Sequence, residues 1–437
     1  MAGNLGTDPR SIIDEGAMRF WQWLAILVTV GLNAIDGFDL LSISFAAPGI
    51  AKAWGIDKAA LGWVLSTELI GMALGSVVLG GVADKLGRRP LILTCIVAMV
   101  AGMFGAASAA AVPTLMLFRF LTGLGIGGML AAINALAAEL SNRRWRSVAM
   151  AFMVIGYPIG GVLGGLAVQR ILTHGDWRGI FTFGAWATAA FLPIVWLFAP
   201  ESVEFLERTR PPGALERINR ILARFGHAPA TALSSVANEA SQSLADLFRP
   251  QLLATTLIVT VAYFAHMTSF YFLLKWVPKI IVDLGYEPKA AAGVLTWLNV
   301  GGASGGAIFG LIAARVGLKR LTIVTLLATF VMIIRFGHGA AGLGALTAIV
   351  TIAGAFNNSA IVGLYSLFAA VFPTHVRAAG TGFAIGVGRG GAVLAPVFAG
   401  YMLQAGLGLQ LVAIAMSMGS LLAALALLKL RVNPAPA

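Results

Sequence analysis

The sequence predicts an all-α membrane protein with twelve transmembrane helices, and three observations indicate this fold class. Of the 437 residues, 59% are hydrophobic and only 11% are charged, whereas soluble domains are usually about 25% charged. Apolar stretches of roughly 20 residues, the length that crosses a bilayer, recur from Trp21 to Leu430. One long polar segment, about residues 199–250, divides these stretches into six and six.

The domain organisation follows from this division. A polar tail precedes a first six-helix bundle, a loop connects it to a second six-helix bundle, and a short tail ends the chain. The expected boundaries are 1–20, 21–198, 199–250, 251–430 and 431–437. Within the loop, Leu215, Ile218 and Leu222 recur at helical spacing. This spacing predicts a short amphipathic helix that lies on the cytoplasmic membrane surface.

The two halves of the chain repeat with an offset of about 230 residues. Matching positions include Pro48 and Pro278, Gly55 and Gly285, and Gly87 and Gly317. A repeat of six helices in the same orientation predicts two bundles related by an axis along the membrane normal. The substrate site is then expected in a central cavity between the bundles, near the middle of the membrane.

The net charge of +12 is interpreted loop by loop, because Lys and Arg concentrate in the cytoplasmic loops of membrane proteins. Placing the N-terminus in the cytoplasm puts about twenty of the basic residues on that side. Both termini are then cytoplasmic and the expected location is the plasma membrane. The positive charge therefore does not indicate nucleic-acid binding. The single cysteine, Cys95, allows no intrachain disulfide.

The first span carries acidic residues where lipid is expected. Asn33, Asp36 and Asp39 are spaced by three, which predicts a polar stripe on one helix face. A charge at this depth costs at least ~2.5 kcal/mol, so each one requires a partner, water or a function. Two neighbouring carboxylates do not both ionise easily. Asp36 and Asp39 are therefore candidate proton acceptors that line a water-filled passage, the alternative being a structural ion pair.

Three further ionisable residues lie within the spans. Arg119 and Arg389 are expected either to pair with the acidic residues of the first span or to bind a substrate anion through the planar guanidinium group. Glu68, near the middle of the second span, is expected either to join this network or to remain protonated. The sequence alone leaves these alternatives open.

Other residues are candidates for the wall of the central cavity. His266 is the repeat counterpart of Asp36 and is expected to face the same cavity, the alternative being a hydrogen-bonded packing role. Phe38, Tyr263 and Trp297 are expected to supply an aromatic wall, unless they only pack helices. Lys275 lies close enough to a helix end to extend its ammonium group towards water, and it is assigned no chemistry.

Several segments resemble a known family. The sequence GVADKLGRR at 81–89 resembles the cytoplasmic loop motif of the major facilitator superfamily. Arg119, followed by Gly123 and Gly125, is similar to the fourth-helix motif in which the arginine is linked to proton coupling. Three further positions resemble the aromatic acid:proton symporters within the superfamily. They are Asp36-Gly37-Phe38-Asp39, Pro200-Glu201-Ser202 and Arg389.

The resemblance implies roles for these residues. Proton coupling would involve Asp36, Asp39 and Arg119, with Glu68 nearby. A conformational gate would lie in the cytoplasmic loops, at Gly81, Asp84, Gly87, Arg88, Arg89, Arg143 and Arg146. Asp84 would act as a latch near a helix N-terminus, where a carboxylate is favoured. Ala314 replaces this aspartate in the second half.

The resemblance also implies a function, namely import of a benzoate-like or hydroxybenzoate-like anion by proton symport through alternating access. Importing a monoanion into an inside-negative cell is opposed by about 2.3 kcal/mol per 100 mV, and a co-transported proton removes this penalty. The expected protein is a monomeric transporter without cofactor or metal, and not an enzyme. Alternatives are a proton antiporter that exports drugs or metabolites, a carrier of another organic acid, and a membrane sensor.

Overall fold

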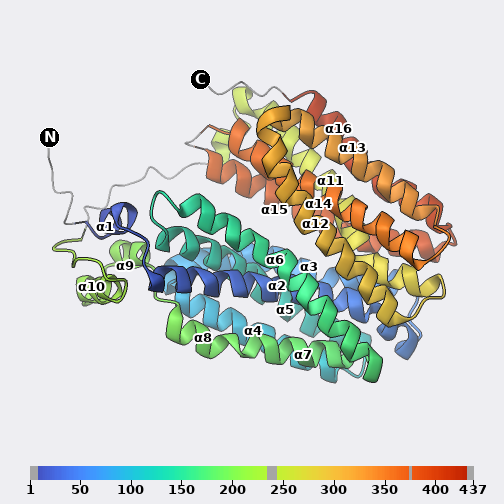
Figure 1. Ribbon diagram of the computed structural model, residues 1–437, viewed down its shortest axis with the longest axis horizontal. Helices are drawn as coiled ribbons and strands as arrows, with labels where there is room; N and C mark the ends of the chain where they lie inside the picture. Colours follow the sequence, from blue (N-terminus) through green and yellow to red (C-terminus); the bar gives the residue numbers. More distant parts are fainter. Residues whose placement is uncertain (1–7, 234–243, 374–375, 431–437) are drawn as a thin grey trace. The chain divides into compact units, whose positions relative to one another are not determined.

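The computed structural model describes residues 8–233, 244–373 and 376–430, and these residues are almost entirely helical (Figure 1). The helices are α1 (Pro9–Glu15), α2 (Phe20–Trp54), α3 (Lys58–Leu86), α4 (Arg88–Ser108), α5 (Val112–Leu140), α6 (Arg146–His174), α7 (Arg178–Ala189), α8 (Phe191–Phe198), α9 (Val203–Thr209), α10 (Ala214–Arg224), the 3-10 helix η1 (Leu244–Phe248), α11 (Pro250–Asp283), α12 (Pro288–Val316), α13 (Leu318–Gly337), α14 (Leu343–Val371), α15 (Arg377–Gln404) and α16 (Leu409–Leu428). Among the described residues, 12 segments are long and apolar enough to cross a membrane, with α7 and α8 forming one of them. The predicted all-α membrane fold is confirmed.

The chain divides into two compact units. Unit 1 contains residues 1–40, 70–160 and 181–239, and unit 2 contains residues 41–69, 161–180 and 240–437. In unit 1, α4 packs along α5, and in unit 2, α12 packs along α14 while α11 packs against α15 and α16. The division falls within α2, α3, α6 and α7, and so differs from the boundaries expected from the sequence, which stay a prediction.

The repeat is visible in the backbone. Helices α12 and α13 begin 230 residues after α3 and α4. The glycines that precede α4 and α13 match as well, because Gly87 has φ 100° and Gly317 has φ 93°. L-residues with a side chain rarely adopt this conformation. The same backbone turn is therefore required at the same position of both halves, which confirms the offset.

Glycines allow the helices of unit 1 to approach closely. A Cβ added at Gly37 of α2 would lie 2.1 Å from the carbonyl oxygen of Tyr157 in α6, and one at Gly160 of α6 would lie 1.7 Å from the carbonyl oxygen of Ala34. Small residues permit such backbone contacts between membrane helices. Gly37 and Gly160 therefore allow the backbones of α2 and α6 to come into direct contact.

Three short helices in unit 1 form a separate module, here called the α1/α9/α10 module, at one end of the long helices (Figure 1). Its core consists of Ile13, Val203, Leu206, Ile218, Leu222 and Ala230, all of which are buried. The predicted amphipathic helix exists as α10, and its buried residues Ile218 and Leu222 pack against α1 and α9. Its location on the membrane surface stays a prediction.

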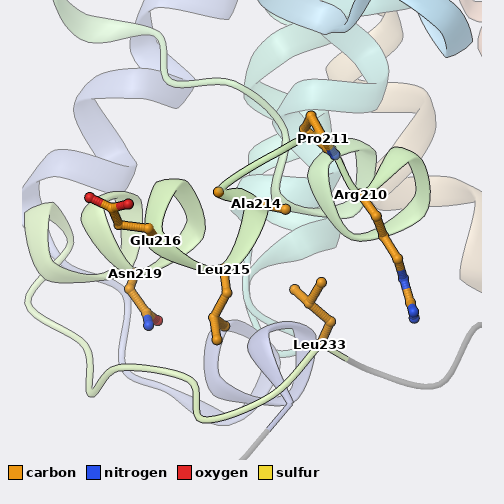
Figure 2. Close-up of a pocket in the computed structure, with 8 residues that line it drawn as sticks. Arg210, Pro211, Ala214, Leu215, Glu216, Asn219 and Leu233 are labelled. Carbon is orange, nitrogen blue, oxygen red and sulfur yellow. The ribbon is translucent and has the colours of Figure 1, made fainter.

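A shallow pocket of about 630 Å³ lies on the surface of this module. Figure 2 shows its lining side chains, with Arg210 and Glu216 at opposite ends of the group. None of the residues assigned to transport from the sequence lines this pocket. The candidate functional site is therefore to be found in the long helices.

The contact between α2 and α6 yields a prediction. Gly160→Ala is expected to destabilise the protein by roughly 1–3 kcal/mol, because the new methyl group forces the two backbones apart. The measurement is the thermal unfolding midpoint of purified protein. Gly386→Ala is the matched control, since an added Cβ there meets no atom within 4 Å in the described structure. Equal midpoints for the two variants would contradict the close contact.

Candidate functional site

The two acidic residues of α2 are enclosed by protein. Asp36 is 3% exposed and Asp39 is fully buried. The Asp39 carboxylate accepts a hydrogen bond of 3.4 Å from the Thr188 hydroxyl of α7, and a Cβ at Gly184 of α7 would lie 3.3 Å from the same carboxylate. In this conformation the acids do not line an open passage, so proton exchange at Asp39 requires a rearrangement that admits water.

Arg119 of α5 lies beside Asp39 and is also fully buried. Its Nη2 donates to the main-chain carbonyl oxygen of Asp39 at 2.9 Å, and its Nη1 lies 2.9 Å from the sulfur of Met103. The guanidinium group also lies over the ring of Phe181, 5.3 Å from the centroid. The structure therefore brings together Asp39 and Arg119, two of the predicted coupling residues, on facing helices.

The predicted polar stripe of α2 does not form one open face. Residues spaced by three on an α-helix lag by about 60° per step, so Asn33 and Asp39 point roughly 120° apart. The Asn33 amide donates to the carbonyl oxygen of Met153 in α6 at 2.6 Å, whereas Asp39 faces α7. Phe38 packs edge-to-face on Phe183 at 5.4 Å between centroids. Asn33 and Phe38 thus both contribute to helix packing in unit 1.

Unit 2 contains a buried ion pair that the sequence analysis missed. The Lys275 ammonium of α11 lies 3.6 Å from the Glu68 carboxylate of α3, and both side chains are 0% exposed. The expectation that Lys275 reaches water at a helix end is wrong. It lies eight residues before the end of α11 at Asp283, a distance of about 12 Å along the axis. That distance exceeds the reach of a lysine side chain. The sequence could therefore have indicated that Lys275 needs a partner inside the protein.

An aromatic cluster of Tyr263, Tyr365 and Phe368 lies in unit 2, against the helix that carries the predicted substrate arginine. The Tyr263 hydroxyl lies 3.0 Å from the Tyr365 hydroxyl, and the Tyr263 ring meets Phe368 at 5.6 Å between centroids. A Cβ added at Gly388, the residue before Arg389, would lie 2.0 Å from the Tyr263 ring, so Tyr263 packs closely against this part of α15. The structure therefore places Tyr263 next to the segment that carries Arg389, and Tyr365 is an additional residue that the sequence did not indicate.

His266 and Trp297 lie in different surroundings. His266 is fully buried, with one ring nitrogen 3.0 Å from the Ser420 hydroxyl and the other 3.2 Å from the carbonyl oxygen of Asn357. Both ring nitrogens therefore have protein partners on neighbouring helices, which favours the packing alternative. Trp297 of α12 is 53% exposed, whereas Tyr263 is buried. The aromatic wall of a central cavity stays a prediction for both residues.

The predicted gate loop is tied to the segment that follows α8. The Glu201 carboxylate accepts hydrogen bonds from the main-chain N–H groups of Arg88, Arg89 and Ser202 at 2.8, 3.3 and 2.8 Å. It thereby caps the N-terminus of α4, where a negative charge is favoured. Gly87 has no room for a side chain, because a Cβ would lie 2.4 Å from the same carboxylate.

The other gate residues also contact acids of unit 1. Arg88 lies 3.6 Å from the Glu139 carboxylate at the end of α5. Arg146 pairs with Asp14 of α1 at 2.5 Å, and the main-chain N–H of Arg143 donates to the Asp14 carbonyl oxygen at 3.1 Å. Gly81 has open space around its α-carbon. The Asp84 side chain lies outside the described residues, so the predicted latch stays a prediction.

Comparison with known proteins identifies the family. The model of the Major Facilitator Superfamily matches residues 29–340. The chain belongs to the Major Facilitator Superfamily. It is therefore a multi-pass membrane protein that transports a small molecule, and not an enzyme.

Similar members of this superfamily include three bacterial transporters. The gallate transporter of Pseudomonas putida is 28% identical over 98% of this chain and 97% of its own length. The 3-(3-hydroxy-phenyl)propionate transporter of Escherichia coli is 29% identical over 92% of this chain and 93% of its own length. The 4-hydroxybenzoate transporter of Acinetobacter baylyi is 27% identical over 88% of this chain and 86% of its own length.

Solved structures of the superfamily share the fold. The D-xylose-proton symporter is 17% identical with a TM-score of 0.72, and the alignment covers 93% of this chain and 97% of that one. A bacterial homologue of the human lysosomal transporter Spinster is 17% identical with a TM-score of 0.74, covering 96% and 100%. At this level of identity the similarity establishes the fold alone.

The buried pair of unit 2 yields a prediction about stability. Lys275→Met is expected to destabilise the protein by about 3–5 kcal/mol, because the Glu68 carboxylate loses the ammonium group beside it in a buried environment. Glu68→Gln together with Lys275→Met is expected to recover most of this loss. The measurement is the unfolding midpoint of the two single variants and the double variant. Additive losses would contradict a direct interaction.

Proposed function

We propose that this transporter imports an aromatic carboxylate in symport with protons, through alternating access. It acts as a monomer in the bacterial inner membrane, with both termini in the cytoplasm. Full-length similarity to carriers named for gallate, hydroxyphenylpropionate and hydroxybenzoate supports this substrate class. The observation that carries the coupling proposal is the burial of Asp36 and Asp39 on α2 beside the buried Arg119 of α5.

In this proposal Arg389 binds the substrate carboxylate. A guanidinium group can donate two parallel hydrogen bonds to a carboxylate. Tyr263, which packs against α15 beside Arg389, offers a hydroxyl group and a ring face to a hydroxylated aromatic ring. The arrangement suits a planar aromatic anion better than a lipophilic cation, which the positive charge of Arg389 would repel.

Asp36 and Asp39 supply the proton site. Burial disfavours the charged form of a carboxyl group, because the charge loses its contact with water, and so it favours binding of a proton. Arg119 is fixed by the carbonyl oxygen of Asp39, so its positive charge stays beside the acids. When water reaches them, Arg119 favours release of the proton. One co-transported proton per monoanion makes uptake electrically neutral and removes the opposing potential.

The gate residues act on the cytoplasmic side in this proposal. Glu201 fixes the start of α4, and Glu139 and Asp14 hold Arg88 and Arg146. Asp84, near the end of α3, alternates between partners as the transporter opens and closes. Gly87, between α3 and α4, gives the junction of the two helices the backbone conformation that the movement requires.

The test of the function is uptake of labelled 4-hydroxybenzoate into lipid vesicles that contain the purified protein. Vesicles without protein are the control. An inward proton gradient is expected to drive accumulation above equilibrium, and a protonophore is expected to abolish it. Unlabelled gallate should compete, whereas xylose should not. Uptake that is indifferent to the protonophore would remove the coupling, and reduced toxicity of lipophilic cations without any uptake of aromatic acid would instead indicate an exporter.

The same assay tests the proton site. Asp36→Asn and Asp39→Asn are each expected to abolish accumulation while the protein remains in the membrane, because the amide cannot bind and release a proton. Exchange of internal for external substrate should persist in at least one variant. Asp57→Asn is the matched control, since Asp57 is an exposed residue that caps α3. Normal accumulation by both variants would exclude the site.

The substrate arginine gives a separate prediction. Arg389→Gln is expected to raise the substrate concentration for half-maximal uptake by at least about tenfold, which corresponds to the loss of roughly 1.4 kcal/mol of binding free energy. The maximal rate should change less than the half-saturation concentration. Arg335→Gln is the control, because Arg335 is bonded to the carbonyl oxygen of Gly339 at an exposed helix end. Loss of Arg389→Gln protein from the membrane would instead indicate a structural pair.

A further inference from the structure

A second group of basic side chains lies around the predicted gate residue Arg89. A groove of about 570 Å³ in unit 1 runs between the start of α4, the segment that follows α8, and α10. Its charged lining residues are Lys85, Arg89, Arg217, Arg220, Arg224 and Glu201. Five positive charges therefore face one negative charge. Like charges held together repel one another, so such a groove favours an anionic occupant.

The single carboxylate that lines the groove already accepts hydrogen bonds from the protein backbone. Glu201 accepts the main-chain N–H groups at the start of α4, and this role fixes its orientation. Arg220 pairs with Glu216 at 3.4 Å, but both side chains are more than 70% exposed, and such pairs contribute little. The positive charges of the groove are therefore not neutralised by the acids beside them.

Two of the arginines are held in place by α8 and its neighbours. Arg89 donates through Nη2 to the Trp196 carbonyl oxygen at 2.5 Å and lies over the Trp196 ring. Its Nε is buried and donates to no acceptor among the described residues. Arg224 donates to the Leu197 carbonyl oxygen at 2.6 Å and lies over the Trp21 ring. These guanidinium groups are therefore fixed at the edge of the groove.

The spacing of α10 places the remaining arginines. Arg217, Arg220 and Arg224 are three and four residues apart, so they share one face of the helix. The opposite face carries Ile218 and Leu222, which are fully buried in the α1/α9/α10 module. Packing of the apolar face thus orients the basic face towards Lys85 and Arg89.

Apolar side chains border the groove on the side of the membrane spans. Trp196 is 64% exposed and Leu197 is 56% exposed at the end of the span that α7 and α8 form. Leu86, at the end of α3, is 57% exposed. Tryptophans concentrate at the level of lipid headgroups, and basic pockets at this level bind anionic headgroups. A soluble anion would gain nothing from these exposed apolar surfaces, whereas the acyl chains of a lipid would cover them.

We propose that this groove binds the phosphate of an anionic phospholipid headgroup, with the acyl chains against Trp196 and Leu197. Arg217 and Lys85 contribute charge from opposite sides of the phosphate, and Arg89 donates from the edge. The bound lipid joins α10 to the adjoining ends of α3 and α4, which carry the same sign of charge as α10 in the groove.

The experiment is native mass spectrometry of the purified full-length protein titrated with phosphatidylglycerol or phosphatidylcholine. The wild-type protein is expected to bind phosphatidylglycerol in clear preference. The variant K85Q/R217Q/R220Q, which removes three exposed basic residues, is expected to lose at least about tenfold of this affinity. The matched control R315Q/R320Q/K429Q removes the same charge from exposed positions of unit 2 and should change affinity less than about twofold.

A second measurement does not depend on any variant. Hydrogen exchange of the wild-type peptide that contains α10 is expected to slow when phosphatidylglycerol is added and to stay unchanged with phosphatidylcholine. Inorganic phosphate is the probe for a soluble anion. Equal losses in the two triple variants, no preference for phosphatidylglycerol, or the same protection of α10 by inorganic phosphate would each overturn the proposal.

Discussion

The burial of charged side chains among apolar helices is the constraint on which the structure of this protein depends. A charge inside the membrane is expensive unless the protein surrounds it with partners. Arg119 meets this requirement through the backbone of α2, because the carbonyl oxygen of Asp39 accepts its hydrogen bond. The position of α5 relative to α2 is thereby set by a main-chain group that no side-chain substitution removes. The chemistry proposed for the acids depends on this contact.

Close backbone packing makes that arrangement possible. Gly37 lies between the two acids in the sequence, and its missing side chain lets α6 approach the face of α2 that Asp39 does not use. The glycine and the acids therefore have separate roles within one short motif. Gly37 holds α2 against α6, and the two acids present ionisable groups to α5 and α7. The segment from Asp36 to Asp39 therefore uses different faces of the helix for packing and for chemistry.

The fold could be predicted from the sequence because hydropathy and glycine positions are local properties. The twelve spans follow from apolar length alone, and the repeat follows from pairs such as Gly87 and Gly317, which share an unusual backbone conformation. The contact of Asp39 with Arg119 could be expected from the cost of buried charge. The partner of Glu68 could not, because Lys275 is distant in the sequence and the pairing depends on how α3 and α11 pack. The surroundings of His266 were likewise beyond prediction, since both of its partners come from other helices.

The carboxylate of Glu201 has a mechanical consequence. One of its oxygens accepts N–H groups from two residues at the start of α4 and from Ser202, whose hydroxyl in turn caps α9. The first turn of α4 and the first turn of α9 are thus joined by a single rigid group. While these hydrogen bonds persist, a tilt of α4 is transmitted to α9, so the segment that follows α8 is mechanically coupled to the first six spans.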